Sequence, residues 1–187
     1  VQGIFSYATV IYAFGIIPIL ELLFSSSDSP YSEDQKSSRA INVFFDVLLY
    51  LNVPLVFATL YGGFQILIST ELALYERIGL VLSVGIVLGT NGINVAHELG
   101  HRITQSEQFL AKLLLLPSLY MHFFVEHNLG HHKHVGTTED PATARKNQSV
   151  YGFWLSSVTG QIVSATKIQR HLLQVNQAGF FSLKNEL

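Results

Sequence analysis

Five of the eight histidines in this chain lie in two short motifs, His97-Glu98-Leu99-Gly100-His101 and Glu126-His127-Asn128-Leu129-Gly130-His131-His132. Side chains four residues apart share one face of a helix, so each motif presents a histidine pair. Neutral imidazole binds zinc, copper, iron and nickel. The chain has no cysteine, so any metal must be bound through nitrogen and oxygen. The two motifs therefore predict part of a metal site, with five candidate ligands: His97, His101, His127, His131 and His132.

The number of histidines constrains the kind of site. A catalytic zinc uses about three protein ligands, so five histidines favour two metals, or one site with spare residues. The first motif also matches the H-E-x-x-H signature of zinc peptidases, in which Glu98 would be the general base. A membrane zinc metallopeptidase using His97, Glu98 and His101 is therefore an alternative, although it leaves 126–132 unused. A metal-binding or transport protein is the non-enzymatic option.

Three long apolar segments must position these motifs. Hydrophobic residues make up 49% of the chain and charged residues only 13%. The predicted membrane spans are about 4–24, 43–68 and 78–96, each close to the ~20 apolar residues that cross a bilayer as a helix. Burying three such helices in a soluble protein would need a very large core. We therefore predict an all-α, multi-span membrane helical bundle, and the net charge of −2 indicates no nucleic-acid partner.

The basic residues predict the orientation of the bundle. Three crossings place the 25–39 loop and everything after Ala96 on one side of the membrane. That side holds ten of the eleven Lys and Arg residues, with only Arg77 opposite. Positive charge is retained on the cytoplasmic side. The histidine-rich metal site should therefore face the cytoplasm.

The apolar segment 109–125 lies between the two motifs. If it crossed the membrane, the two motifs would lie on opposite sides and could not share a metal site. Pro117 lies at its middle and interrupts helical hydrogen bonding. We predict a re-entrant or interfacial segment that returns to the same face of the membrane. This topology is inferred from the requirement that the two motifs share one metal site.

Three motifs in a fixed order carry a more specific resemblance. They are Asn94–Arg102, Glu126–His132 and Glu139–Arg145. In order and spacing they resemble membrane alkane 1-monooxygenase, of the membrane fatty-acid desaturase and hydroxylase superfamily. The resemblance extends to the segments Phe14–Pro18, Glu21, Trp154 and Ser182–Glu186, and so covers nearly the whole chain.

The resemblance implies a non-haem diiron monooxygenase of the bacterial inner membrane, embedded in lipid. Such an enzyme uses O2 to hydroxylate the terminal methyl group of medium- or long-chain n-alkanes to 1-alkanols. Electrons would come from reduced rubredoxin and its reductase. A fatty-acid desaturase or a xylene-type hydroxylase of the same superfamily is the alternative.

The resemblance also implies that this chain is incomplete. The family draws further ligands from later histidine motifs, and neither occurs before Leu187. Five histidines cannot furnish two irons with the nitrogen-rich shell of the family. We expect residues 1–187 to form a single, truncated integral-membrane hydroxylase domain that is inactive alone.

Three acidic residues could orient ligand imidazoles through their ring N–H groups: Glu98, Glu126 and Asp140. Asp140 also suits a helix N-cap, because Pro141 fits the first helical position, and the two roles can coexist.

Four other residues have weaker signals. Ala13 and Gly89 could leave room for an alkyl-chain tunnel, although helix–helix packing explains small residues equally well. His134 is expected to be a surface residue. His122, alone in an apolar segment, is expected to satisfy a local hydrogen bond.

Overall fold

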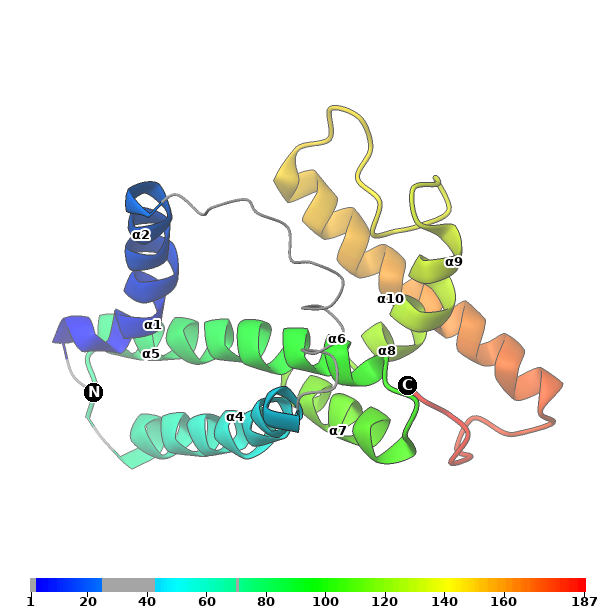
Figure 1. The fold of residues 1–187 in the computed structure, drawn as a ribbon, viewed down its shortest axis with the longest axis horizontal. Coiled ribbons are helices and arrows are strands. Elements are labelled where there is room, and N and C mark those ends of the chain that lie inside the picture. Colours follow the sequence, from blue (N-terminus) through cyan, green and yellow to red (C-terminus); the bar gives the residue numbers. More distant parts are fainter. Residues whose placement is uncertain (1–2, 25–42, 70) are drawn as a thin grey trace. The chain divides into compact units, whose positions relative to one another are not determined.

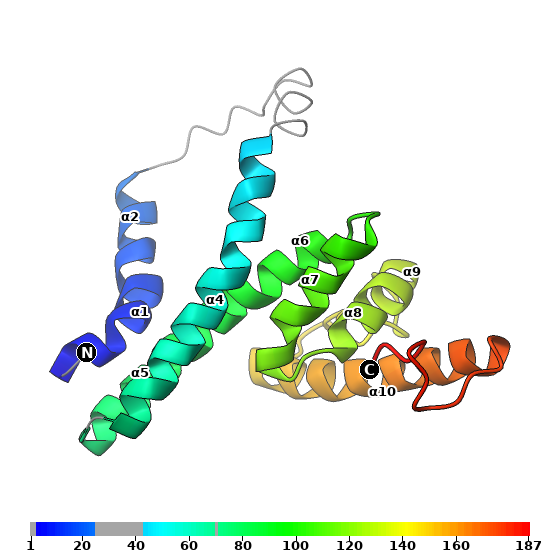
Figure 2. The same cartoon turned by 90° about the horizontal axis from the view of Figure 1, so that it is seen from below.

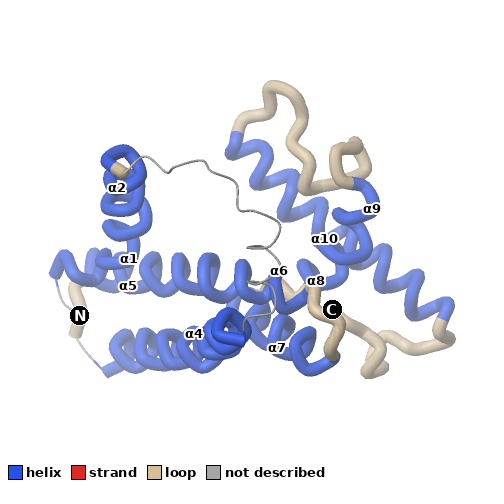
Figure 3. The backbone as a smooth tube through the Cα atoms, viewed as in Figure 1, coloured by secondary structure: helices blue, strands red, loops and turns tan. Residues whose placement is uncertain are grey.

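The structure is a computed structural model that describes residues 3–24, 43–69 and 71–187. Throughout these ranges the regular elements are helices, with no strand (Figures 1 and 3). The all-helical prediction is therefore confirmed. The predicted loop at 25–39 lies outside the described residues. The chain separates into two compact units, Val1–Val95 and Ala96–Leu187.

The first unit begins with a bent run of consecutive helical segments (Figure 1). Its parts are η1 (Gly3–Tyr7), α1 (Ala8–Ile11), the π-helical segment η2 (Tyr12–Ile16) and α2 (Ile17–Leu23). Its start is fixed against α5 (Leu74–Val87), where Ser83 donates a hydrogen bond to the Ser6 carbonyl at 2.8 Å. At Gly79 a Cβ would lie 2.6 Å from the Tyr7 ring, so glycine permits this close approach.

Two long helices complete the first unit. Helix α4 spans Val43–Ser69 and lies against α5 in both views (Figures 1 and 2). The contact is close at Gly63, where a Cβ would come within 2.9 Å of Val84. Helix α5 continues through the π-helical segment η3 (Leu88–Ile93) into α6 (Asn94–Gly100). The long apolar helices of the described residues are therefore the segment from η1 to α2, helix α4, and the segment from α5 to α6.

Three helices are long and apolar enough to cross a membrane: Gly3–Leu23, Val43–Ser69 and Leu74–Gly100. They agree in number, length and apolar composition with the three predicted spans, but the third helix runs from Leu74 to Gly100 rather than from about 78 to 96. The charged residues Glu76 and Arg77 lie in the first turn of this helix. In the structure Glu76 accepts the Ala73 N–H at 2.8 Å and Arg77 donates to the Leu72 carbonyl at 3.2 Å. Both charges thus stabilise the helix start rather than precede it.

The second unit consists of shorter helices around one long one. Its elements are α7 (Gln105–Leu115), η4 (Leu116–Ser118), α8 (His122–Glu126), the π-helical η5 (His127–His131), α9 (His132–His134) and α10 (Val150–Val175). Helix α8 packs on α10. The fully buried side chains of this unit include Leu99, Leu114 and Leu115. This core fixes the backbone that carries both histidine motifs.

The segment 109–125 is broken, as the position of Pro117 predicts. Helix α7 ends at Leu115, and Leu119 adopts a left-handed conformation with φ of 53°. The chain resumes as α8 at His122. No candidate span among the described helices covers this segment. Its return to the same membrane face stays a prediction.

Candidate metal centre

Four imidazoles in the second unit converge through their Nε2 atoms. His101 Nε2 lies 3.2 Å from that of His97 and 3.1 Å from that of His127. His132 Nε2 lies 3.1 Å from that of His127. Ligand atoms of His97, His101 and His127 all fall within 4.8 Å of one another. The structure therefore brings together four of the five predicted ligands through the same ring nitrogen.

The π-helical segment η5 explains which histidines of the second motif meet. A π-helix has a wider turn than an α-helix, so residues five apart approach the same face. His127 accordingly meets His132 rather than His131. The His131 ring stacks on His127 with a centroid distance of 5.3 Å. Spacing alone predicted the pair His127 and His131, and the local winding of the helix changes that pairing.

The fifth histidine is held by a buried carboxylate. The Asp140 Oδ2 atom accepts a hydrogen bond from His131 Nδ1 at 2.9 Å, and Asp140 is only 3% exposed. Burial alone would raise the pKa of Asp140, but hydrogen bonds from Thr143, Ala142 and His131 outweigh it and hold the pKa below its usual value. With its proton on Nδ1, His131 keeps the Nε2 lone pair free for a metal.

The predicted helix after Asp140 is wrong. Residues 141–149 form turns, and α10 begins only at Val150. Asp140 Oδ1 accepts the Ala142 N–H at 2.9 Å, which is the bond of an Asx turn. The carboxylate therefore caps a turn and holds His131 at once. The sequence suggested both roles but placed the first on a helix.

The electrostatics of the cluster suit a bound cation. Burial, followed by the neighbouring His97, His132, His101 and His131, lowers the pKa of His127 to about 3. Its ring is therefore neutral near pH 7, with a lone pair to donate. Neutral imidazoles whose nitrogens crowd to 3.1 Å fit one or more transition-metal ions, because a cation replaces lone-pair repulsion with coordination.

The expected bonds from imidazoles to Glu98 and Glu126 are absent from the described residues. Glu98 instead forms an ion pair with Arg102 at 3.1 Å. Glu126 is 1% exposed, interacts with Ser164 of α10, and leaves Oε1 without a hydrogen-bond partner. Burial, with a contribution from Asp140, raises the pKa of Glu126.

The remaining histidines lie outside the cluster. His134 Nδ1 pairs with Glu139 at 3.0 Å, in keeping with a peripheral residue. The expectation for His122 fails at its Nε2 atom, which is buried and has no hydrogen-bond partner among the described residues. Sequence reasoning also missed Phe123, whose ring stacks on His127 at 4.8 Å. The signal was available, because Phe123 precedes His127 by four residues and so shares its face.

The two tunnel candidates lie in the first unit, within π-helical segments. Ala13 belongs to η2 and Gly89 to η3. A cavity of about 320 Å³ opens in this unit among α1, α4 and α5, lined in part by Gly62 and Gly63. Neither Ala13 nor Gly89 lines it, so the tunnel stays a prediction.

Comparison with known families decides the affiliation. The sequence model of the fatty acid desaturase family matches residues 77–185, which include both histidine motifs and the Asp140 turn. The chain belongs to the fatty acid desaturase family. The predicted superfamily is thereby confirmed.

Within this family, the relatives found are bacterial hydroxylases. The chain is 33% identical to alkane 1-monooxygenase 1 of Alcanivorax borkumensis over 93% of its length, covering 43% of that protein. It is 35% identical to alkane 1-monooxygenase 1 of Pseudomonas aeruginosa over 97% of its length, covering 48% of that protein. The hydroxylase component of xylene/toluene monooxygenase from Pseudomonas putida is 28% identical over 80% of the chain, which covers 42% of that protein.

These similarities confirm the predicted resemblance to alkane 1-monooxygenase. The chain spans about half the length of the curated relatives it matches. Together with three candidate spans, membership of this family makes the chain part of an integral membrane protein.

Proposed function

We propose that this chain is part of a non-haem diiron monooxygenase. The enzyme hydroxylates the terminal methyl group of medium- or long-chain n-alkanes, giving 1-alkanols. The observation that carries the proposal is the convergence of four histidine Nε2 atoms beside a fifth histidine held by Asp140. A zinc peptidase would use His97, Glu98 and His101 with one further ligand, and it would leave most of the second histidine group without a role.

The residues of the centre have distinct tasks in this proposal. The metal would be held by five histidines: His97, His101, His127, His131 and His132. When bound, iron would supply the activation of O2. No side-chain acid or base is strong enough to attack an unactivated C–H bond. Asp140 fixes the tautomer of His131. Burial keeps His127 neutral, so its lone pair is available near pH 7.

The substrate class is proposed from the relatives. Those that cover most of this chain are named alkane 1-monooxygenases. The xylene/toluene relative makes an aromatic methyl group the second candidate, at lower identity and lower coverage. Both substrates present a methyl group, so the alternatives differ in the shape of the apolar cavity and not in the reaction.

The membrane, the orientation and the electron donor are proposed from the same family. The metal centre faces the cytoplasm of a bacterial inner membrane, and reduced rubredoxin, regenerated by its reductase, delivers the electrons. The excess of Lys and Arg after Ala96 supports this orientation.

The test uses the full-length protein in lipid nanodiscs with octane, rubredoxin, its reductase and ¹⁸O2. We expect one labelled oxygen atom in 1-octanol. His131→Ala should abolish the product, whereas His171→Ala, on the exposed surface of α10, should leave it unchanged. Unlabelled product or none, together with hydrolysis of a peptide substrate, would overturn the proposal in favour of a peptidase.

A further inference from the structure

Four aromatic rings of the Ala96–Leu187 unit form a stacked column that contains two of the candidate ligands. Its members are Tyr120, Phe123, His127 and His131. The centroid of the Phe123 ring lies 5.4 Å from that of Tyr120 and 4.8 Å from that of His127. The His131 ring stacks on the His127 ring at 5.3 Å. The planes of neighbouring rings are inclined by only 15° to 21°. The column therefore links two imidazoles of the metal centre to two aromatic residues outside it.

The Tyr120 end of the column is tied to helix α10 by buried hydrogen bonds. Tyr120 Oη donates to Gln161 Oε1 at 3.0 Å, and Gln161 Nε2 donates to Ser157 Oγ at 2.8 Å. Both residues of α10 are buried. Burial raises the pKa of Tyr120, so its hydroxyl keeps the proton that it donates near pH 7. This end of the column cannot turn without breaking a buried hydrogen bond, which is costly.

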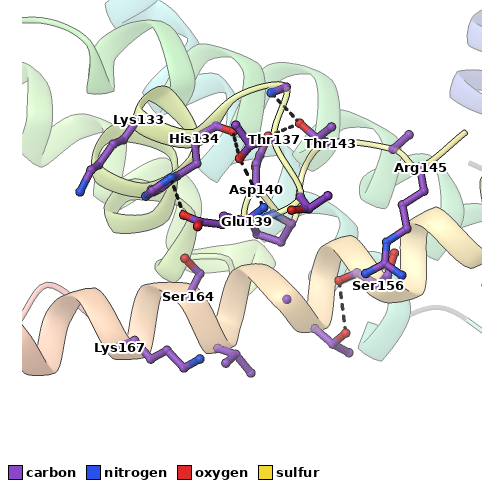
Figure 4. Close-up of a pocket in the computed structure, with 18 of the residues that line it drawn as sticks. Lys133, His134, Thr137, Glu139, Asp140, Thr143, Arg145, Ser156, Ser164 and Lys167 are labelled. Atoms are coloured by element: carbon purple, nitrogen blue, oxygen red, sulfur yellow. Dashed lines mark hydrogen bonds and ion pairs between the residues drawn. The ribbon is translucent and has the colours of Figure 1, made fainter.

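The His131 end of the column is tied to the buried Asp140 carboxylate. His131 Nδ1 donates to Asp140 Oδ2 at 2.9 Å, and the Thr143 hydroxyl donates to the same oxygen. Figure 4 shows Asp140 and Thr143 on the loop above helix α10. That loop touches α10 at Gly160, where a Cβ would lie 2.6 Å from the Pro141 Cβ. Both ends of the column are therefore fixed, directly or through this loop, against the same helix.

The turn between α7 and α8 places Tyr120 at the end of the column. The N–H of Leu119 bonds to the Leu116 carbonyl, and that of Tyr120 to the Leu115 carbonyl. Leu119 itself is left-handed, with φ of 53°. These are the features of a Schellman turn, in which glycine usually takes the left-handed position. A left-handed leucine is uncommon and strained. Such strain is typical of functional segments, and here it directs Tyr120 towards Gln161.

We propose that Tyr120 is a positioning residue of the metal centre, which sets the ring plane of His127 through Phe123. The Tyr120 hydroxyl bonds to Gln161 and not to the cluster, so Tyr120 acts only through its neighbours. An imidazole binds a metal along the lone pair in its ring plane, so the tilt of the His127 ring decides where Nε2 points. Stacked rings resist this tilt. The inference rests on the proposed function only in requiring that the cluster binds a metal.

The experiment measures Co²⁺ binding to the full-length protein in lipid nanodiscs, after a chelator has removed other metals. Cobalt binds imidazole nitrogen, and its visible absorption bands report the arrangement of its ligands. Two variants break the hydrogen bond from opposite sides: Tyr120→Phe keeps the ring but loses the hydroxyl, and Gln161→Leu loses the acceptor. The matched control is Tyr151→Phe, because Tyr151 is exposed and its ring contacts Trp154, outside the column.

We expect Tyr120→Phe and Gln161→Leu to weaken Co²⁺ binding by about three- to tenfold, less than the loss of a direct hydrogen bond to a ligand. Both should displace the absorption bands of the bound ion in the same direction, and Tyr151→Phe should change neither affinity nor bands. If Tyr120→Phe lowers only the unfolding temperature, with the affinity and bands of the wild type, Tyr120 merely packs the interior and the inference is overturned.

A double-mutant cycle tests whether Tyr120 acts through Phe123. Phe123→Leu removes the ring between Tyr120 and His127. In that background Tyr120→Phe should change Co²⁺ affinity by about twofold or less, because the link is already broken. An undiminished effect of Tyr120→Phe there would contradict the column.

The activity of the wild type separates this inference from the proposed function. A wild type that fails to hydroxylate octane when loaded with iron would overturn the proposed function. Displaced cobalt bands in Tyr120→Phe would support the column even then, because they do not depend on the reaction.

Discussion

At the scale of single residues, the centre depends on groups that do not themselves bind metal. Asp140 illustrates this, because one buried carboxylate closes the 141–143 turn and holds His131. Phe123 likewise holds His127 in place, by stacking on its ring. The positions of His131 and His127 are therefore set before any metal binds, which is how supporting groups raise metal affinity.

Replacing Asp140 by Asn should weaken metal binding without unfolding the chain. The amide keeps the size of the carboxylate but loses the charge that favours the Nδ1–H form of His131. We expect a loss of metal affinity of about 10- to 100-fold, measured by competition with a chelator. Glu139→Gln is the control, since Glu139 contacts His134 and not the cluster. Equal affinity in both variants would contradict the role of Asp140.

The low pKa of His127 predicts how the stability of the metal-free chain depends on pH. The folded-state pKa is about 3, against a usual value of 6.5, so between these values the unfolded chain binds more protons. The free energy of unfolding should then rise with pH across this window and fall as the pH drops from about 6.5 towards about 3. Thermal unfolding in detergent with a chelator present should show this slope, reduced in His127→Gln. The same slope in wild type and variant would contradict the lowered pKa.

At the scale of elements, π-helical winding and one close helix–loop contact shape the centre. The η5 segment rotates His131 away from the other four nitrogens and towards Asp140. The Asp140 turn is held against α10 at Gly160, where a Cβ would lie 2.6 Å from the Pro141 Cβ. Helix α10 thus helps to position Asp140, which holds His131.

Substituting Gly160 by Ala tests this coupling. The added methyl group should push Pro141, and with it Asp140, away from α10, and lower metal affinity. Gly85→Ala is the control, because a Cβ there meets no atom within 4 Å. Alanine inside a helix is favoured over glycine by about 1 kcal/mol, so a lower metal affinity only in Gly160→Ala must come from the contact. Unchanged metal binding in that variant would show that the turn tolerates displacement.

Sequence patterns predict the helices better than the details of the site. Three spans follow from uninterrupted apolar runs, and the break near Pro117 follows from its missing N–H. The pairing of His127 with His132 could not be predicted, because nothing in spacing distinguishes π from α winding. The burial of Glu126 and the turn at Asp140 also escaped prediction, since both depend on packing against α10, far along the chain.

At the scale of the whole molecule, hydropathy and charge predict how the chain is oriented in the membrane. Three candidate spans and the excess of Lys and Arg after Ala96 predict that residues 97–187 face the cytoplasm. The short segment between the second and third spans should then face the opposite side.

The absence of cysteine from this chain makes the topology directly testable. Single cysteines at Thr138 and Glu71, both exposed, should react differently with a membrane-impermeant maleimide applied to intact spheroplasts. We expect labelling of Glu71→Cys at once and of Thr138→Cys only after the membrane is permeabilised. The reverse pattern would invert the proposed orientation, and labelling of both would contradict three crossings.

The central claim is that the clustered histidines bind the irons of an oxygenase. The most direct measurement is the metal content of the full-length protein, purified in lipid nanodiscs and analysed by plasma mass spectrometry and Mössbauer spectroscopy. We expect about two coupled iron ions per chain, lost together in His101→Ala and His132→Ala. A single zinc ion per chain, retained in His132→Ala, would contradict the account.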